Sequence, residues 1–305
     1  MSANNTVACA SCHLQANAFA DPKKFSEGFE GGLTGRNSMG LSNAKYYDNG
    51  SFFWDERASS LEEQVLMPIQ DHIEMGLTLE ELVTKIQAQS YYNGLFSAAF
   101  NNEEVTSNKI VLALSQFVRS MASYESKFDK GLAGVGGNNM NANFSNFSDL
   151  ENLGKNLFMS GRTDCNRCHE TAMFSGDRAR NNGLDAITTD QGLGAVTGNR
   201  NDDGKFKTNS LRNIELTGPY MHDGRFTTLE EVIDHYNSGI QNHPNLDDRP
   251  RERNNNRAVR MNLSQNEKNA LVAFLKTLTD KGVRQNSLFS MCISFLPLPA
   301  GRPAE

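Results

Sequence analysis

The sequence contains Cys9-Ala10-Ser11-Cys12-His13 near its start and Cys165-Asn166-Arg167-Cys168-His169 in its second half. Both stretches follow the pattern C-x-x-C-H, which is typical of covalent haem attachment. Two cysteines on one turn can form thioethers at one edge of a porphyrin, and the histidine that follows can bind the iron. Two such motifs predict two haem c groups, with His13 and His169 as the proximal iron ligands.

Two other kinds of site also use closely spaced cysteines. A thioredoxin-type dithiol needs a flanking βαβ pattern, which neither motif has. A zinc site would bring the two cysteine pairs together and would not need a histidine directly after each pair. The repeated histidine therefore favours haem. The fifth cysteine, Cys292, stands alone near the C-terminus, and we assign it no role.

Composition bounds the class of protein. Of the 305 residues, 38% are hydrophobic and 22% are charged, which predicts a packed core. A net charge of −6 gives no general reason to bind nucleic acid or an anionic membrane surface. No apolar segment is long enough to span a bilayer. Because haem is attached to such motifs outside the cytoplasm, we expect a periplasmic protein whose signal peptide is missing from this sequence.

The predicted fold class is mainly α, with two cytochrome c-like haem domains. Apolar residues at helical spacing and two capping boxes predict helices at Leu79–Gln89, Lys109–Phe128, Leu150–Met159, Thr228–Tyr236 and Ser264–Leu278. Gly131–Asn146, rich in Gly and Asn, is the predicted linker. We therefore expect an N-terminal haem domain at residues 1–145, a C-terminal haem domain at 146–285, and a tail at 286–305 without an assigned role.

Further segments lie between the two haem motifs and after the second one, and we refer to them below as the family segments. They are Arg36-Asn37-Ser38, Phe53-Trp54-Asp55-Glu56-Arg57-Ala58, Glu63-Gln64, Pro68-Ile69, Glu74-Met75-Gly76, Ser210-Leu211-Arg212-Asn213 and Leu216-Thr217-Gly218-Pro219-Tyr220-Met221-His222-Asp223-Gly224. In these segments the sequence resembles the bacterial di-haem cytochrome c peroxidases and their relative MauG, which matures a tryptophan-derived cofactor. The resemblance extends from about Thr6 to about Leu278.

The resemblance implies that the N-terminal haem reduces hydrogen peroxide. Glu74 matches the family's acid–base glutamate, Gln64 matches a glutamine beside it, and Trp54 matches the residue that couples the two haems. The chemistry needs a carboxylate that takes a proton from one peroxide oxygen and returns it to the other, so that water can leave. The implied electron donor is a small redox protein, either a monohaem cytochrome c or a cupredoxin.

The resemblance also implies a calcium ion between the domains. Asn37 and the main-chain carbonyls of Thr217 and Pro219 match the family's ligands, and such oxygen ligands suit a hard cation. The assembly state is open, with a homodimer as one option.

Two positions depart from the usual peroxidase pattern. Many members carry a histidine before Arg-Asn-(Ser/Ala) that closes the N-terminal iron in the oxidised enzyme. Here the loop 25–35 has no histidine, and His72 is not at the matching position. We therefore expect that peroxide binds without prior reduction.

The second departure concerns the C-terminal haem. Most members place a methionine ligand fourteen residues after the histidine that matches His222, and this position is Tyr236 here, as in MauG. A phenolate stabilises the more oxidised states of iron. Met221, His235 and Met261 are the alternative ligands.

Two other functions stay open. A MauG-like enzyme would oxidise a side chain of a partner protein, which the tyrosine ligand and the uncapped first haem favour. A di-haem electron carrier would need no Glu/Gln pair.

Overall fold

The computed structural model describes residues 1–170, 172–252 and 257–289, and these residues are mainly helical, as predicted. The helices are α1 (Cys9–Cys12), α2 (Leu61–Gln64), α3 (Met67–Gln70), α4 (Leu79–Gln87), α5 (Tyr91–Phe100), α6 (Ser107–Ser120), α7 (Lys127–Gly134), α8 (Asp149–Phe158), α9 (Leu193–Thr197), α10 (Leu229–Asp234), α11 (Gln265–Lys276) and α12 (Lys281–Gln285). Short helical turns are η1 (Gln15–Asn17), η2 (Ala44–Tyr46), η3 (Cys165–Arg167), η4 (Arg200–Asp202), η5 (Ile214–Leu216) and η6 (His235–Gly239). The strands β1 (Ala179–Arg180) and β2 (Phe206–Lys207) pair in antiparallel fashion.

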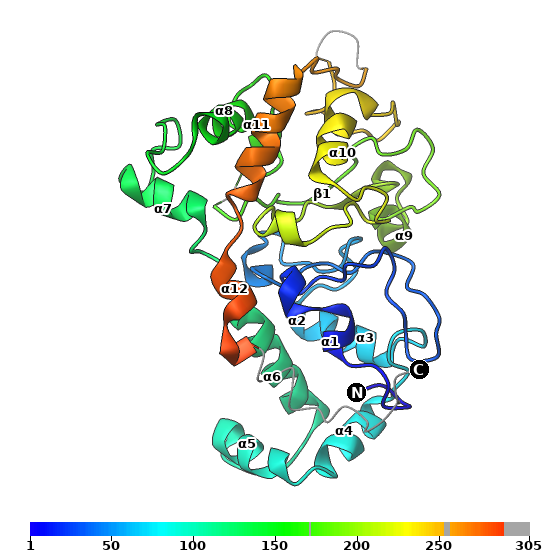
Figure 1. Cartoon of the computed structure of the whole chain (residues 1–305). Coiled ribbons are helices and arrows are strands. Elements are labelled where there is room, and N and C mark those ends of the chain that lie inside the picture. Colours follow the sequence, from blue (N-terminus) through cyan, green and yellow to red (C-terminus); the bar gives the residue numbers. More distant parts are fainter. Residues whose placement is uncertain (171, 253–256, 290–305) are drawn as a thin grey trace, which may run out of the picture.

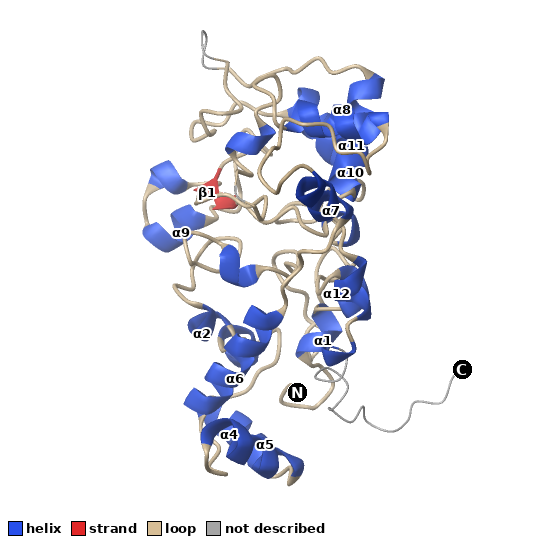
Figure 2. Cartoon of the chain, turned by 90° about the vertical axis from the view of Figure 1, so that its left-hand side faces the viewer, coloured by secondary structure: helices blue, strands red, loops and turns tan. Residues whose placement is uncertain are grey.

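The helices form two groups, each around its own apolar core (Figures 1 and 2). The lower half holds α1–α6 and α12, and the upper half holds α7–α11 with β1 and β2. In the upper half, α8 packs along α11, and Phe158, Phe174 and Phe274 are buried between the helices and loops. In the lower half, Ile69 and Phe96 belong to a second buried cluster.

Local capping signals set the helix starts. The side chain of Thr228 accepts a hydrogen bond from the N–H of Glu231, and Ser264 accepts one from Glu267 in the same way, which confirms both predicted capping boxes. Helix α6 ends at Ser120, so the prediction that it continues to Phe128 is wrong.

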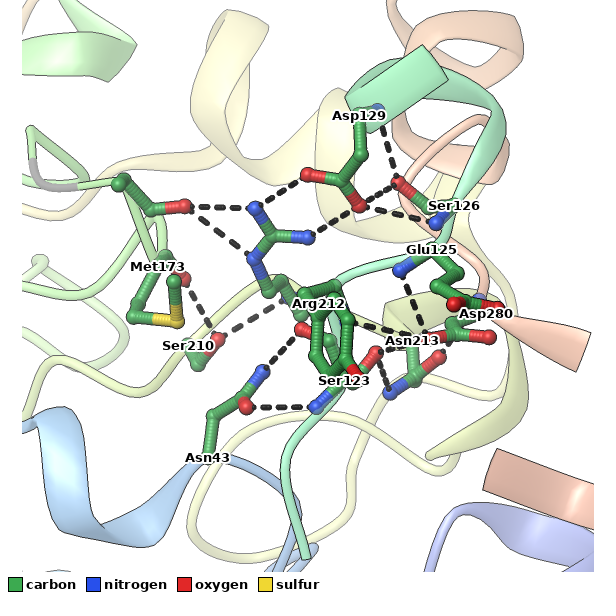
Figure 3. A network of polar contacts seen from close by, with 12 residues as sticks. Asn43, Ser123, Glu125, Ser126, Asp129, Met173, Ser210, Arg212, Asn213 and Asp280 are labelled. Atoms are coloured by element: carbon green, nitrogen blue, oxygen red, sulfur yellow. Dashed lines mark hydrogen bonds and ion pairs between the residues drawn. The ribbon is translucent and has the colours of Figure 1, made fainter. Parts of the chain in front are cut away.

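The segment after α6 leaves the helix because its main chain bonds elsewhere (Figure 3). The side-chain amide of Asn43 donates to the carbonyl of Ser123 at 3.1 Å, and the N–H of Ser123 donates back at 2.8 Å. Asn213 of the upper half donates to the Ser123 hydroxyl at 3.0 Å and accepts from the N–H of Asp280 at 2.8 Å. This buried polar network connects the two halves.

The segment predicted as a linker, Gly131–Asn146, packs against the upper core. Helix α7 begins at Lys127, ahead of the predicted linker, and Phe128 and Phe144 are 2% and 1% exposed in the upper core. A Cβ at Gly131 would lie 2.4 Å from the Phe144 ring, so only glycine allows this packing. The apolar core therefore changes from the lower to the upper half between Ser120 and Lys127, ahead of the boundary expected at residue 145.

The chain returns to the lower half at its C-terminal end. The side-chain amide of Gln15 donates to the carbonyls of Val283 and Asn286, and the Phe289 ring meets Phe19 edge-on at 5.7 Å. Cys292 and the rest of the predicted tail lie outside the described residues. In the described part of the chain, no helix is both long and apolar enough to cross a membrane.

Candidate functional site

Both haem motifs lie on single helical turns, α1 and η3, which place the histidines in matching surroundings. The Nδ1 atoms of His13 and His169 lie 2.8 Å from the carbonyl oxygens of Phe19 and Phe174, respectively. A proton on Nδ1 leaves Nε2 as the nitrogen that can bind a metal. Burial lowers the pKa of His13 and lowers that of His169 to about 4, which favours the neutral imidazole that binds iron.

One continuous cavity of about 1150 Å³ connects the two motifs. Cys12, His13, Cys165, Cys168 and His169 all line it. Its volume exceeds the roughly 300–1000 Å³ that is usual for a single small-molecule site. The four motif cysteines are free thiols, so none of them is lost to a disulfide. These residues fit two haem groups attached at opposite ends of one cavity.

Gln64 and Glu74 line the same cavity as His13. Gln64 is the last residue of α2, and Glu74 follows a turn in which the Asp71 carboxylate accepts the N–H groups of Ile73 and Glu74. Neither side chain forms a hydrogen bond or an ion pair with another described residue. Burial, with the nearby Asp71, raises the pKa of Glu74.

Among the described residues of the loop 25–35 and its neighbours, no histidine besides His13 lines the cavity near the first motif. His72 is exposed and does not line the cavity, and the loop 25–35 contributes Ser26, Thr34 and Gly35 to the wall. Among the described residues that line the cavity, the histidines are His13, His169 and His222. The ring of His222 stacks on Phe206 at 3.6 Å.

Trp54 lies where the two halves meet. Its loop is closed by two main-chain hydrogen bonds between Phe52 and Ala58. The indole N–H donates to the carbonyl of Asn37 at 2.8 Å, and the ring meets His222 edge-on at 6.5 Å between centroids. Trp54 therefore lines the cavity at the junction of the halves, as its predicted role requires.

Tyr236 lies in η6, a π-helical turn that extends α10, and it also lines the cavity. Such turns are rare and frequent at functional sites. The Tyr236 hydroxyl accepts a hydrogen bond from the Asn182 side chain at 3.2 Å, and burial raises the Tyr236 pKa to about 12. A phenolate would therefore form there only beside a bound cation.

The alternative ligands differ in position. Met221 and Met261 line the cavity, but His235 does not. The Nε2 of His235 lies 3.2 Å from the main-chain carbonyl of Asn182. Geometry therefore leaves Tyr236 and the two methionines as side chains that can reach the second haem.

Comparison with known proteins identifies the family. The sequence model of the di-haem cytochrome c peroxidases matches residues 1–136. The methylamine utilization protein MauG of Methylorubrum extorquens AM1 is 34% identical over 91% of this chain and 74% of its own length. The chain belongs to the di-haem cytochrome c peroxidase and MauG family. The cytochrome c551 peroxidase of Nitrosomonas europaea is 31% identical over 92% of this chain and 76% of its own length.

Two solved structures are similar to this chain in fold. A MauG-like protein associated with microbial copper homeostasis superposes with a TM-score of 0.82 at 32% identity, covering 94% of this chain and 88% of its own. The diheme peroxidase BthA of Burkholderia thailandensis E264 has a TM-score of 0.71 at 23% identity, over 90% and 81% of the two chains, and shares the fold. Membership of the di-haem peroxidase family implies haem c cofactors.

The three residues predicted to bind calcium, Asn37, Thr217 and Pro219, all line the cavity. The Asn37 side-chain N–H donates to the carbonyls of Lys23 and Lys24 at 3.1 and 3.3 Å, which turns its carbonyl oxygen away from both. In the described part of the chain, no group of three or more His, Cys, Asp or Glu side chains gathers to bind a metal ion. A cation site here would therefore use neutral oxygens.

Several residues at the junction of the halves were not predicted from the sequence. Arg36 forms ion pairs with Asp55 of its own half and with Asp190 of the upper half. Its guanidinium also lies 5.6 Å from the Phe206 ring centroid. Lys207 lines the cavity beside them. The only sequence signal was that Arg36 begins one of the family segments.

Proposed function

We propose that this protein reduces hydrogen peroxide to water at the haem held by His13, using electrons from a small redox protein. The observation that carries the proposal is the pair Gln64 and Glu74, which line the cavity with His13 and make no hydrogen bond or ion pair with another described side chain. A partly buried carboxylate that no side chain hydrogen-bonds is available to act on a ligand.

Haem c supplies an iron ion that binds peroxide and exchanges electrons. Glu74 would take the proton from the inner peroxide oxygen and deliver it to the outer one, which then leaves as water. Its raised pKa lies closer to neutral pH, which suits a group that must first accept a proton and then release it. The Gln64 amide can hydrogen-bond peroxide without adding charge.

Electrons must cross from one half to the other. Trp54 is an aromatic residue at the junction and would couple the two haem sites, with His169 and Tyr236 holding the second haem. Asn37, Thr217 and Pro219 would bind calcium beside this contact. The donor would be a monohaem cytochrome c or a cupredoxin in the periplasm.

Tyr236 supports a second candidate, the MauG-like oxidation of a side chain on a partner protein. A buried phenol beside the second haem can stabilise oxidised iron, which suits an enzyme that stores oxidising equivalents. The 34% identity to a MauG is in keeping with this alternative.

Steady-state peroxide consumption by the holoprotein separates the candidates. A peroxidase turns over peroxide with a reduced cytochrome c or cupredoxin as donor, and the donor is oxidised in a ratio of two per peroxide. A MauG-like enzyme consumes peroxide slowly with such donors. A simple electron carrier accepts and returns electrons but leaves peroxide intact.

A further inference from the structure

Lys207 belongs to the upper half, yet its side chain ends in the lower half. Its ammonium group donates to the main-chain carbonyl of Ser51 at 2.8 Å. The same group lies 3.8 Å from the ring centroid of Tyr47 and 4.7 Å from that of Phe52. Lys207 is only 8% exposed. An ammonium group is thus buried in an aromatic pocket at the junction of the halves.

The main chain of Lys207 contacts the same loop. Its N–H donates to the carbonyl of Trp54 at 2.7 Å, so one residue binds the carbonyls of both Ser51 and Trp54. Between them, Phe53 has a φ of +67°, a backbone conformation that non-glycine residues rarely adopt. Such a conformation persists where surrounding contacts impose it. The two hydrogen bonds from Lys207 are contacts of that kind.

Strand β2 is also linked to the Trp54 ring indirectly, through His222. Phe206 stacks on His222 at 3.6 Å, and His222 meets the indole edge at 6.5 Å between centroids. Lys207 itself is paired with Ala179 of β1, so its position is tied to the upper half. A shift of β2 would therefore move both the carbonyl and the ring contacts of Trp54.

The burial of a lysine ammonium group at this position has a desolvation cost. Burial lowers the pKa of Lys207 to about 7, although Glu56 partly opposes the effect. A methionine of similar length could fill the aromatic pocket without the desolvation cost, but it could not donate to Ser51. The hydrogen-bonding ability of the ammonium group is thus the property that distinguishes lysine here.

We propose that Lys207 is the positioning residue that fixes Trp54 between the two haem sites, by binding the main-chain carbonyls of Ser51 and Trp54. The functional half of this inference rests on the proposed role of Trp54 as the coupling residue. A group that must stand in one geometry is effective only when neighbouring contacts restrict it, and displacements near 1 Å can cost about a hundredfold in rate.

The test compares Lys207→Met with Lys205→Met in the oxidised holoprotein. Lys205 lies two residues away, and its ammonium group binds Asp202 at 3.0 Å. Because Trp54 is the single tryptophan, the indole bands in an ultraviolet resonance Raman spectrum report its side-chain torsion and its N–H hydrogen bond without overlap. We expect Lys207→Met to shift these bands and to slow electron transfer between the haems about tenfold or more, and Lys205→Met to change neither.

A second variant keeps the test valid if Lys207→Met does not fold with both haems attached. Phe52→Leu removes one aromatic face of the pocket and keeps Lys207, and a smaller shift in the same direction is expected. Unchanged indole bands in the folded variants would overturn the positioning role. Shifted bands with an unchanged inter-haem rate would support the positioning role and contradict the proposed coupling function of Trp54.

Discussion

The indole N–H of Trp54 donates to the main-chain carbonyl of Asn37 at 2.8 Å. The side chain of Asn37 is predicted to bind calcium, and the main-chain N–H of Asn37 donates to the carbonyl of His222 at 2.8 Å. Asn37 therefore links Trp54 of the lower half, the predicted cation site and the upper half. Binding or loss of a cation at Asn37 should therefore change the hydrogen bond of the Trp54 indole.

Calcium removal should slow electron transfer between the haems, because it frees Asn37 and with it the indole hydrogen bond. The measurement is the inter-haem rate before and after chelation, with metal content determined in parallel. Asn37→Ala should behave like the chelated protein and show no further response to chelator. A wild-type protein that contains no calcium and does not respond to chelator would contradict this prediction.

Glu74→Gln should lower peroxide turnover by about two to four orders of magnitude, the usual contribution of a general acid–base group. Both haems should remain attached, because the side chain of Glu74 makes no hydrogen bond or ion pair with another described residue. Turnover is measured with a saturating reduced donor. Glu80→Gln, which changes an exposed carboxylate in the first turn of α4, serves as the matched control. Equal rates for the two variants would rule out the catalytic role.

The pH profile should report the same carboxylate. Glu74 must be ionised to accept the first proton, and burial raises its pKa. Turnover per bound peroxide should therefore fall as pH drops through a value above about 4.3, the ordinary glutamate pKa. The residual activity of Glu74→Gln should lack this acidic limb. If turnover still falls at low pH in Glu74→Gln, the fall arises from the titration of another group.

The oxidised protein should react with peroxide without prior reduction. Among the described residues that line the cavity, His222 is the one histidine outside the two motifs, and its ring is stacked on Phe206. Rapid mixing with peroxide should therefore change the haem absorption spectrum at once. A lag that disappears only after one-electron reduction would show that some group closes the first iron.

Tyr236→Met should raise the reduction potential of the C-terminal haem and leave that of the N-terminal haem unchanged. A thioether favours ferrous iron, whereas a phenolate favours oxidised iron. Spectroelectrochemical titration resolves the two potentials, so the first haem acts as an internal control. Unchanged potentials at both haems would assign the ligand to Met221 or Met261, the other candidates that line the cavity.

Local sequence signals predicted much of this molecule. The two C-x-x-C-H motifs and the capping boxes at Thr228 and Ser264 are complete within a few residues, so they can be recognised without knowledge of the fold. The family segments located Gln64, Trp54 and Glu74, which the structure brings to one cavity. Whether each performs its predicted role stays a prediction.

Contacts between distant segments could not be predicted. Helical spacing extended α6 to Phe128, but the bonds between Asn43 and Ser123 redirect the chain after Ser120. The composition of the segment 131–146 indicated a linker, because its buried phenylalanine is hidden among small and polar residues. Nothing in the sequence indicated that Lys207 is buried, since its partner Ser51 lies 156 positions away.

Changes to α12 and the described residues after it should affect the surroundings of the first haem motif. Phe289 rests against Phe19, the residue whose carbonyl orients His13, and Gln15 binds the carbonyls that end α12. Residues 283–289 thus contact the segment that orients His13, although the first motif is far from them in sequence. A deletion or fusion there would be expected to alter the spectrum of the first haem before that of the second, and an N-terminal fragment expressed alone would need residues 281–289 supplied in trans.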